Sequence, residues 1–360
     1  MDTRKLTLLF ICQTLDADSP LLAATLKWIE TLALHKDIEH VYVLCLRAGR
    51  FSLPDNVHRY VIKAHGTCRI KAFFNFYSHF FRILKKGKPD LAFVYMAGPY
   101  PFLLLPWRCF TKLRVFMWKS HSQANLTFRL QVLFCLDKWL AINKAQAPFD
   151  SKKLVCMGQS TDTTRFRPIQ VAGKEYDFIA VGRIAPIKRN VEIVKALHIC
   201  RKKYGKKYSL VFCGDAVDGM GTIYKRRLTA EIDKYKLNNQ VCFAGNVLYS
   251  DLPVYYNKSH CFVFACKGGV GKATLEAMAC GIPVIIADPD AAGFFPECVR
   301  DTVVCGHEPE SIAEGMVRIR ELGDDTAEEI GNLLRGIVAE NWDHAGHIES
   351  IVKIMKKEVF

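Results

Sequence analysis

Apolar runs of strand length alternate with segments of helical pattern along almost the whole chain, and this alternation constrains the fold most. Parallel strands need long crossover connections, usually helices, so the pattern predicts parallel sheets covered by helices. In the first half, strands are predicted at residues 6–12, 40–46, 58–63, 90–96, 114–118 and 138–142. A second series is predicted at residues 178–181, 209–213, 240–244, 260–265, 283–287 and 302–305. The predicted fold class is therefore α/β, with two Rossmann-like doubly wound domains.

The length and composition favour two domains over one. The chain has 360 residues, of which 50% are hydrophobic and 24% charged, so each half can bury a core. Apolar periodicity is lost around residues 157–174. We predict an N-terminal domain at 1–157, a linker at 158–174, a C-terminal domain at 175–340 and a terminal helix at 341–360 that returns to the N-terminal domain. Two doubly wound domains facing a central cleft would bind a ligand at the C-terminal ends of their strands.

The positive charge is concentrated in the first half of the chain. Residues 1–168 hold 25 Lys and Arg against 11 Asp and Glu, whereas residues 169–360 hold 25 of each, so the first part carries the whole net charge of +14. A field of one sign on one domain indicates an anionic partner: phospholipid headgroups, a phosphorylated acceptor or nucleic acid. Nucleic acid is the least favoured of the three, because no recognition motif accompanies the charge.

The cysteines and the N-terminal apolar run bear on the compartment. Fourteen cysteines are scattered without a CxxC pair, which favours reduced thiols. The run at 6–12 is only seven residues long, and no small-x-small cleavage site follows it, so it is interpreted as a buried strand and not as a signal peptide. We therefore expect a cytoplasmic protein, with attachment to the inner face of the membrane as an alternative. That alternative is suggested by residues 69–88, where six aromatics between Phe73 and Phe81 exceed one helix face and Lys85, Lys86 and Lys88 follow. A core helix is the other interpretation.

Two segments of the second half suggest phosphate chemistry. Gly182 ends a predicted strand, and Arg183 and Lys188 follow at its C-terminal edge, where two fixed cations would bind a diphosphate and stabilise a leaving group. A later strand leads into the glycine loop at 267–272 and a helix at 273–280, a pattern that presents backbone N–H groups to phosphate. Glu276 lies one turn into this helix, where its carboxylate suits the hydroxyls of a ribose.

Taken together, these segments resemble the family 4 retaining glycosyltransferases of the B-type fold. The matching pieces are VGRIAPIK, VCFAGNVLYSDLPVYY and LEAMACGIPVI, and the likeness covers roughly residues 150–305. The resemblance implies a hexosyl-type glycosyltransferase that uses a nucleotide-diphospho-sugar, retains configuration and requires no metal or other cofactor. The implied acceptor is a glycan or a lipid-linked saccharide in the synthesis of a surface polysaccharide or glycoconjugate.

The resemblance also assigns roles to residues. Arg183 and Lys188 would hold the donor diphosphate, with Gly182 beside them, and Glu276 would hold the ribose. In the first half, His121 follows a strand like that of the family's active-site histidine and is the candidate at the reacting centre. The remaining donor-binding candidates are Asn246 and Val247 near the base, and Gly269, Val270, Gly271, Lys272 and Ala273 at the phosphate and sugar.

The sequence departs from the family pattern at two places. Gly268 stands where the family has the first of two glutamates, and Leu15–Ser19 replaces a glycine-rich loop. The consequences left open are an unusual donor sugar, a substitute carboxylate such as Asp16 or Asp18, or lost catalysis in a nucleotide-sugar-binding module or partner subunit. The tripeptides Asp16-Ala17-Asp18 and Asp288-Pro289-Asp290 have the Asp-x-Asp pattern of a metal-binding motif, but they are interpreted as turn or cap residues. The loop KGGVGK also resembles a phosphate-binding loop of ATPases, yet Ala273 stands where a Mg²⁺-binding Ser or Thr is needed.

Overall fold

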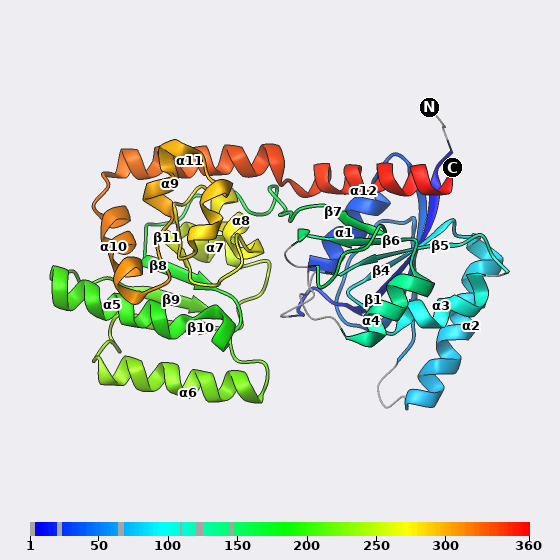
Figure 1. The fold of residues 1–360 in the computed structure, drawn as a ribbon, viewed down its shortest axis with the longest axis horizontal. Coiled ribbons are helices and arrows are strands. Elements are labelled where there is room, and N and C mark those ends of the chain that lie inside the picture. Colours follow the sequence, from blue (N-terminus) through cyan, green and yellow to red (C-terminus); the bar gives the residue numbers. More distant parts are fainter. Residues whose placement is uncertain (1–3, 20–23, 64–67, 109, 120–124, 145–146) are drawn as a thin grey trace. The chain divides into compact units, whose positions relative to one another are not determined.

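The computed structural model describes the chain except for residues 1–3, 20–23, 64–67, 109, 120–124 and 145–146 (Figure 1). It divides into two compact units, residues 1–159 with 344–360 and residues 160–343. Most of the segment 158–174, expected as a linker, thus lies in the second unit, where Phe166 is fully buried. The terminal helix α12, His344–Val359, belongs to the first unit. By this division unit 1 has 26 Lys and Arg against 12 Asp and Glu, and unit 2 has 24 of each.

Unit 1 is built on one parallel sheet of seven strands in the order β3-β2-β1-β4-β5-β6-β7. The strands are β1 Leu6–Leu15, β2 Ile38–Ala48, β3 Val57–Val61, β4 Leu91–Tyr95, β5 Arg114–Trp118, β6 Lys138–Ala141 and β7 Leu154–Cys156. The first six match the predicted runs, and the short β7 was not predicted. The order reverses between β1 and β4, which is the Rossmann arrangement.

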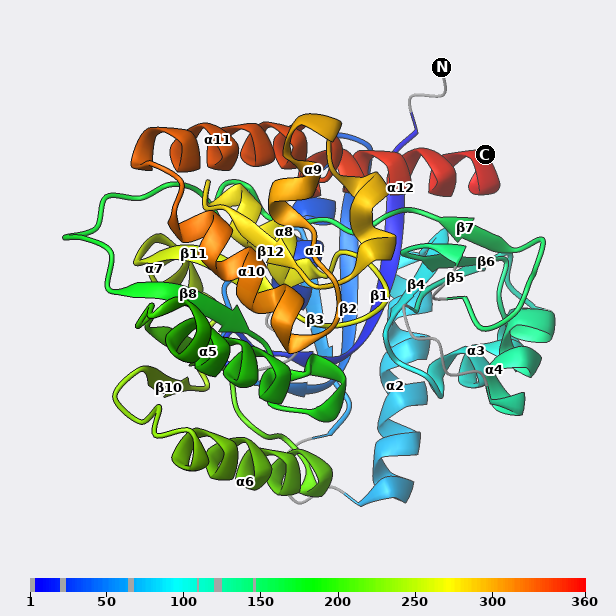
Figure 2. The same ribbon diagram turned by 60° about the vertical axis from the view of Figure 1, so that its left-hand side comes forward.

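Helices cover both faces of this sheet, as the views from two sides show (Figures 1 and 2). Side chains alternate along β1, so that Leu8 and Phe10 enter one core while Leu9 and Ile11 enter the other. The first core is closed by α1 Ala24–Ala33 and α12. The second is closed by α2 Arg69–Gly87, α3 Tyr100–Arg108, α4 Leu126–Leu130 and the π-turn η1 Gln131–Cys135.

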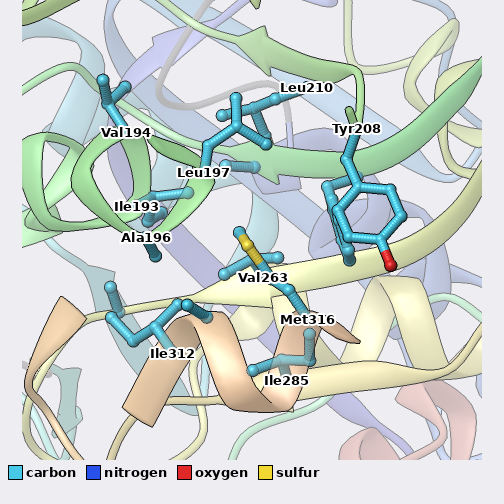
Figure 3. Packing of buried hydrophobic residues seen from close by; sticks show 14 of the residues in the cluster. Ile193, Val194, Ala196, Leu197, Tyr208, Leu210, Val263, Ile285, Ile312 and Met316 are labelled. Carbon is cyan, nitrogen blue, oxygen red and sulfur yellow. The ribbon is translucent and has the colours of Figure 1, made fainter. Parts of the chain in front are cut away.

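Unit 2 repeats the arrangement with five parallel strands in the order β10-β9-β8-β11-β12. The strands are β8 Tyr176–Val181, β9 Leu210–Cys213, β10 Val241–Gly245, β11 Ser259–Phe264 and β12 Val284–Ile286. One face packs on α5 Asn190–Tyr204, α6 Gly219–Lys234 and α10 Pro309–Arg320, and Figure 3 shows Leu197, Val263 and Met316 meeting there. The opposite face packs on α7 Leu252–Asn257, α8 Lys272–Ala279, α9 Glu297–Val303 and α11 Asp324–Asn341. The order reverses between β8 and β11, so these two strands define the switch point of the unit.

One predicted strand is wrong. Residues 302–305 were expected to form the last strand of the second series of apolar runs. Instead, Thr302 and Val303 end helix α9, and only Val304 forms an isolated bridge, to Ile286. The helix is favoured over a strand because it buries Val299 and Val303 against the sheet. Within the described residues, no helix is long and apolar enough to cross a membrane.

Candidate functional site

Lys188 lies at the switch point of unit 2. It ends the 3-10 turn η3, Pro186–Lys188, which follows β8, and its Nζ is 5.3 Å from the centre of the Phe264 ring at the end of β11. A Cβ built on Gly182 would be 3.7 Å from the same Nζ, so the ammonium lies over the ends of both strands. Arg183, also predicted here, is exposed on the same loop. In the part of the chain that the structure describes, neither cation has a carboxylate within 4 Å, whereas Lys225 nearby is paired with Asp215 at 2.6 Å.

The start of helix α8 lies beside Lys188, and Phe264 joins the two. A Cβ on Gly271 would be 2.9 Å from the edge of the Phe264 ring, the ring that Lys188 overlies. Gly271 is the N-cap residue of α8, and the N–H groups of Thr274 and Leu275 bond to its carbonyl. By helix geometry the preceding N–H groups, of Lys272 and Ala273, have no acceptor in a previous turn. The structure therefore brings an ammonium without a carboxylate partner among the described residues and the positive end of a helix together at one strand edge.

The glycine loop before α8 is held by Asp288, a residue that the sequence did not single out for this task. Asp288 is 1% exposed, and its Oδ2 accepts the N–H groups of Gly268 and Gly269, both at 2.8 Å. Its Oδ1 accepts the N–H of Asp290 at 3.2 Å and so caps the 3-10 turn η4, Pro289–Phe294, as the cap interpretation predicted. The Gly269 amide was predicted to bind donor; it donates to Asp288 instead, because the positive φ angles of Gly268 and Gly269 turn both amides toward that carboxylate. A donor-binding role for the Gly269 amide stays a prediction, and it would require that amide to exchange Asp288 for the ligand.

This arrangement also argues against an ATP-binding loop. In a phosphate-binding loop the amides of the glycine segment surround phosphate oxygens. Here a buried carboxylate occupies two of those amides, and its negative charge would repel a phosphate at the same place.

Glu276 is buried on α8 within a shell of hydroxyl groups and one ammonium. It is 4% exposed; Tyr249 donates to Oε1 and Tyr256 to Oε2, both at 3.2 Å, and Lys272 Nζ is 3.9 Å from Oε1. Burial raises the pKa of Glu276, although Lys272 and the tyrosines oppose the rise. Burial lowers the pKa of Lys272. Each carboxylate oxygen keeps a second lone pair, so Glu276 can still accept a ligand hydroxyl.

Two members of this shell were missed at the sequence level. Tyr249 and Tyr256 both lie in the segment VCFAGNVLYSDLPVYY, in which the sequence singled out only Asn246 and Val247. The hydroxyl of the fully buried Tyr256 also lies 3.1 Å from the Ala273 carbonyl, so this carbonyl and Glu276 share its single hydrogen; Phe166 packs edge-on against Tyr249 with ring centres 5.2 Å apart. These aromatic contacts fix where the carboxylate lies.

The other predicted residues are placed at some distance or fall outside the described residues. Asn246 and Val247 follow β10, the edge strand two positions from β8, which is roughly 10 Å across the sheet. Val270 is half-buried against the core of unit 2. His121, the candidate at the reacting centre, lies outside the described residues.

The substitute carboxylates Asp16 and Asp18 are turn residues in unit 1. Asp16 Oδ1 accepts the N–H groups of Asp18 and Arg50, both at 3.1 Å, and the Arg50 guanidinium pairs with Asp18 at 2.7 Å. Among the described residues, no group of three or more potential ligand side chains could hold a metal ion.

The family model "Glycosyl transferases group 1" matches residues 162–332. The O-antigen chain mannosyltransferase RfbU of Salmonella typhimurium is 30% identical over 141 residues, 39% of this chain and 36% of the relative. A GDP-mannose-dependent alpha-(1-6)-phosphatidylinositol monomannoside mannosyltransferase of Mycobacterium tuberculosis is 26% identical over 203 residues, 50% of each chain. The chain thus spans half the length, or less, of these curated relatives.

Among solved structures, Anabaena Alr3699/HepE in complex with UDP and glucose matches with a TM-score of 0.74 at 16% identity. The match covers 98% of this chain and 99% of the Anabaena chain. At this identity the likeness shows the fold alone, and it confirms the predicted class of two Rossmann-like domains.

Proposed function

The chain belongs to the group 1 glycosyltransferases through residues 162–332, and on that premise we propose that it transfers a sugar from a nucleotide-diphospho-sugar to a glycan or lipid-linked acceptor, with retention of configuration. Such a reaction would serve the synthesis of a surface polysaccharide or glycoconjugate. The observation that carries the proposal is the meeting of Lys188 with the N-terminus of α8 at the switch point of unit 2. Positive charge that no carboxylate of the described residues neutralises is what a leaving nucleoside diphosphate requires.

Each part of the donor has a proposed partner in unit 2. Lys188 and Arg183 bind the diphosphate and stabilise the charge that develops as the glycosidic bond to it breaks. The N–H groups of Lys272 and Ala273 add neutral donors and the helix dipole. Glu276 accepts the ribose hydroxyls with its remaining lone pairs. His121 of unit 1 is proposed near the reacting carbon, and unit 1 is proposed to bind the acceptor.

The relatives and Gly268 bear on which sugar the nucleotide donor carries. The names of the relatives concern mannose and GDP-mannose, and the Anabaena structure holds UDP and glucose, so GDP-mannose and UDP-glucose are the first donors to test. Gly268 argues for a different sugar, because the family's carboxylate at this position would hydrogen-bond a sugar hydroxyl. A site without that group loses discrimination against a deoxygenated or amino-substituted sugar. We propose such a modified sugar as the preferred donor.

A thermal-shift screen against UDP-, GDP- and ADP-sugars tests the proposed function. A ligand that binds only the native state raises its stability. A nucleotide sugar that stabilises the protein and is turned over with a saccharide acceptor would support transfer. Stabilisation without turnover for any donor and acceptor would favour the inactive nucleotide-sugar-binding module. No stabilisation by any nucleotide would contradict both.

The role of Gly268 needs a matched pair of variants. Its φ of +99° is unfavourable for any side chain, so Gly268→Glu introduces backbone strain as well as a carboxylate, and Gly268→Ala introduces the strain alone. Better use of GDP-mannose or UDP-glucose by Gly268→Glu than by Gly268→Ala would support altered specificity. Efficient turnover of a plain hexose donor by the wild type would contradict the modified-sugar proposal.

A further inference from the structure

Helix α2 of unit 1 buries one aromatic face and exposes another. Phe76 and Phe80 are fully buried in the core, as a core helix requires. Phe73, Phe74 and Phe81 are 46%, 65% and 41% exposed. The sequence had left open whether the aromatics form core or surface, and the helix does both.

The exposed rings continue onto helix α3 as one connected surface. Phe73 packs against Tyr77 with ring centres 5.0 Å apart, Tyr77 against Phe81 at 6.0 Å, and Phe81 against Trp107 at 4.6 Å. Trp107 in turn reaches Phe110, which is 82% exposed, at 6.3 Å. We call this surface the aromatic strip; it consists of Phe73, Phe74, Tyr77, Phe81, Trp107 and Phe110. Both views place α2 and α3 side by side (Figures 1 and 2).

A cavity of about 710 Å³ lies where the strip ends. Its charged lining, which we call the basic pocket, consists of Arg4, Lys88, Asp90, Arg108, Lys112 and Arg114. Asp137, outside the lining, pairs with Arg108 at 2.7 Å and with Arg114 at 3.3 Å. Lys88 and Lys112 of the pocket have no carboxylate within 4 Å in the part of the chain that the structure describes.

The strip and the pocket are joined through the chain. Trp107 of the strip is followed by Arg108 of the pocket, and Phe110 is followed closely by Lys112. On α2, Leu84 lines the pocket and lies three residues after Phe81, so the two share a helix face. The result is an amphipathic surface, with exposed rings on one side and the lysines Lys88 and Lys112 of the basic pocket at its end.

We propose that this surface docks unit 1 onto an anionic phospholipid membrane, with a headgroup phosphate in the basic pocket and the aromatic strip at the level of the headgroups and first acyl carbons. Amphipathic rings are enriched at membrane interfaces, and each Lys or Arg near an anionic surface adds attraction. Unit 1 also holds the whole net charge of the chain. The surface is remote in sequence from the donor-binding residues, so the proposal stands whether or not the protein transfers sugar.

Single-stranded nucleic acid fits the same surface less well. Bases stack on open ring faces. In the strip, Phe73 meets Tyr77 at 77° and Phe81 meets Trp107 at 87°, so ring edges cover neighbouring ring faces. Ile70, 71% exposed on the same helix, adds an aliphatic group that suits lipid and offers a base nothing to stack on.

Co-sedimentation with vesicles tests the proposal on the full chain. Wild type should bind vesicles that contain phosphatidylglycerol and phosphatidylcholine far better than vesicles of phosphatidylcholine alone. The double variant Lys88→Glu/Lys112→Glu should weaken binding about tenfold or more. Its control, Lys36→Glu/Lys152→Glu, makes the same change of charge at exposed lysines of unit 1 outside the pocket and should weaken binding only slightly.

The aromatic strip is tested by Phe74→Ser/Phe110→Ser, with Leu34→Ser, also exposed in unit 1, as control. All variants should keep the wild-type melting temperature and nucleotide affinity, because the changed side chains are exposed and lie in unit 1. Equal losses in the pocket variant and its control would show a response to net charge alone and overturn the proposal. Strip variants with undiminished binding, or binding of a single-stranded oligonucleotide without binding of vesicles, would overturn it as well.

Discussion

Replacing Glu276 with Gln should weaken nucleotide binding without destabilising the protein at neutral pH. Burial raises the pKa of this carboxyl, so ionisation is less favourable in the folded chain than in the unfolded chain. A group with a raised folded pKa contributes stability below its unfolded pKa, and that contribution is lost as pH rises through the folded value. Gln resembles the protonated form of Glu276. The stability of the Glu276→Gln variant relative to wild type should therefore be highest at neutral pH, and the two proteins should be about equally stable below the ordinary carboxyl pKa of 4.5.

The loss of affinity follows from the hydrogen bonds that the carboxylate can still make. Tyr249 and Tyr256 each take one site on the two oxygens, which leaves a lone pair on each for two ribose hydroxyls. A hydrogen bond to a charged group contributes about 1.5–3 kcal/mol and a neutral one about 0.5–1.5 kcal/mol. The amide oxygen of Gln can still accept one of the two ribose hydroxyls. The loss of binding free energy should therefore be about 1–2 kcal/mol, which corresponds to about a 5- to 30-fold higher Kd.

Calorimetric titration of the nucleoside diphosphate across pH gives the second signature. In wild type the affinity should fall as acid protonates Glu276, starting at a higher pH than an ordinary carboxyl would, and the Gln variant should lack this step. Tyr249→Phe is the control, since it removes one neighbour but keeps the carboxylate. An unchanged Kd for the Gln variant would rule out ribose binding. A lower melting temperature at neutral pH would refute the inference that the buried charge costs stability.

The remaining predictions concern the residues around the strand edge. Arg183→Ala or Lys188→Ala should cost about 2–4 kcal/mol of transition-state stabilisation, measured as kcat/KM for the donor, and full activity in the double variant would contradict the diphosphate role. Asp288→Ala leaves the amides of Gly268 and Gly269 without their acceptor, at about 1.5–3 kcal/mol for each lost bond, and should lower both the melting temperature and nucleotide affinity. Asp288→Asn keeps one acceptor oxygen and should lose less; an equal loss would show that these bonds do not hold the loop.

Strand positions could be predicted because each buried strand is an apolar run that stands out locally. β5 was predicted with its observed bounds, and the strand order follows the usual rules for crossovers. The errors arose where tertiary contacts decide the outcome. β7 has only three residues and is paired along one edge, and Thr302 and Val303 are drawn into a helix by the core that Val299 and Val303 fill.

The site was predicted in part for the same reason. Lys188 and Gly271 belong to local motifs, so their meeting at one strand edge could be inferred from the sequence, and Glu276 follows Gly271 on the same helix. Asp288 could not be found this way: its partners lie about twenty residues away, and the spelling Asp-Pro-Asp indicates only a turn. The hydrogen bond from the Gly269 amide to Asp288 could not be predicted either, because the backbone angles decide which acceptor an amide faces.

The glycine at 268 and the carboxylate at 288 are best understood together. Gly268 has φ +99° and Gly269 +88°, angles that favour glycine, and in this conformation both amides converge on one buried oxygen of Asp288. A glutamate at 268 would have to adopt the unfavourable angle or move the loop away from Asp288. The departure from the family pattern is therefore more than one missing side chain: it accompanies a loop whose shape depends on the absence of that side chain.

If the loop shape sets donor preference, Asp288→Ala should relax the choice of sugar even with Gly268 unchanged. If only the missing carboxylate matters, Asp288→Ala should weaken all donors equally. Relative kcat/KM values for UDP-glucose and for an amino-substituted UDP-sugar distinguish the two.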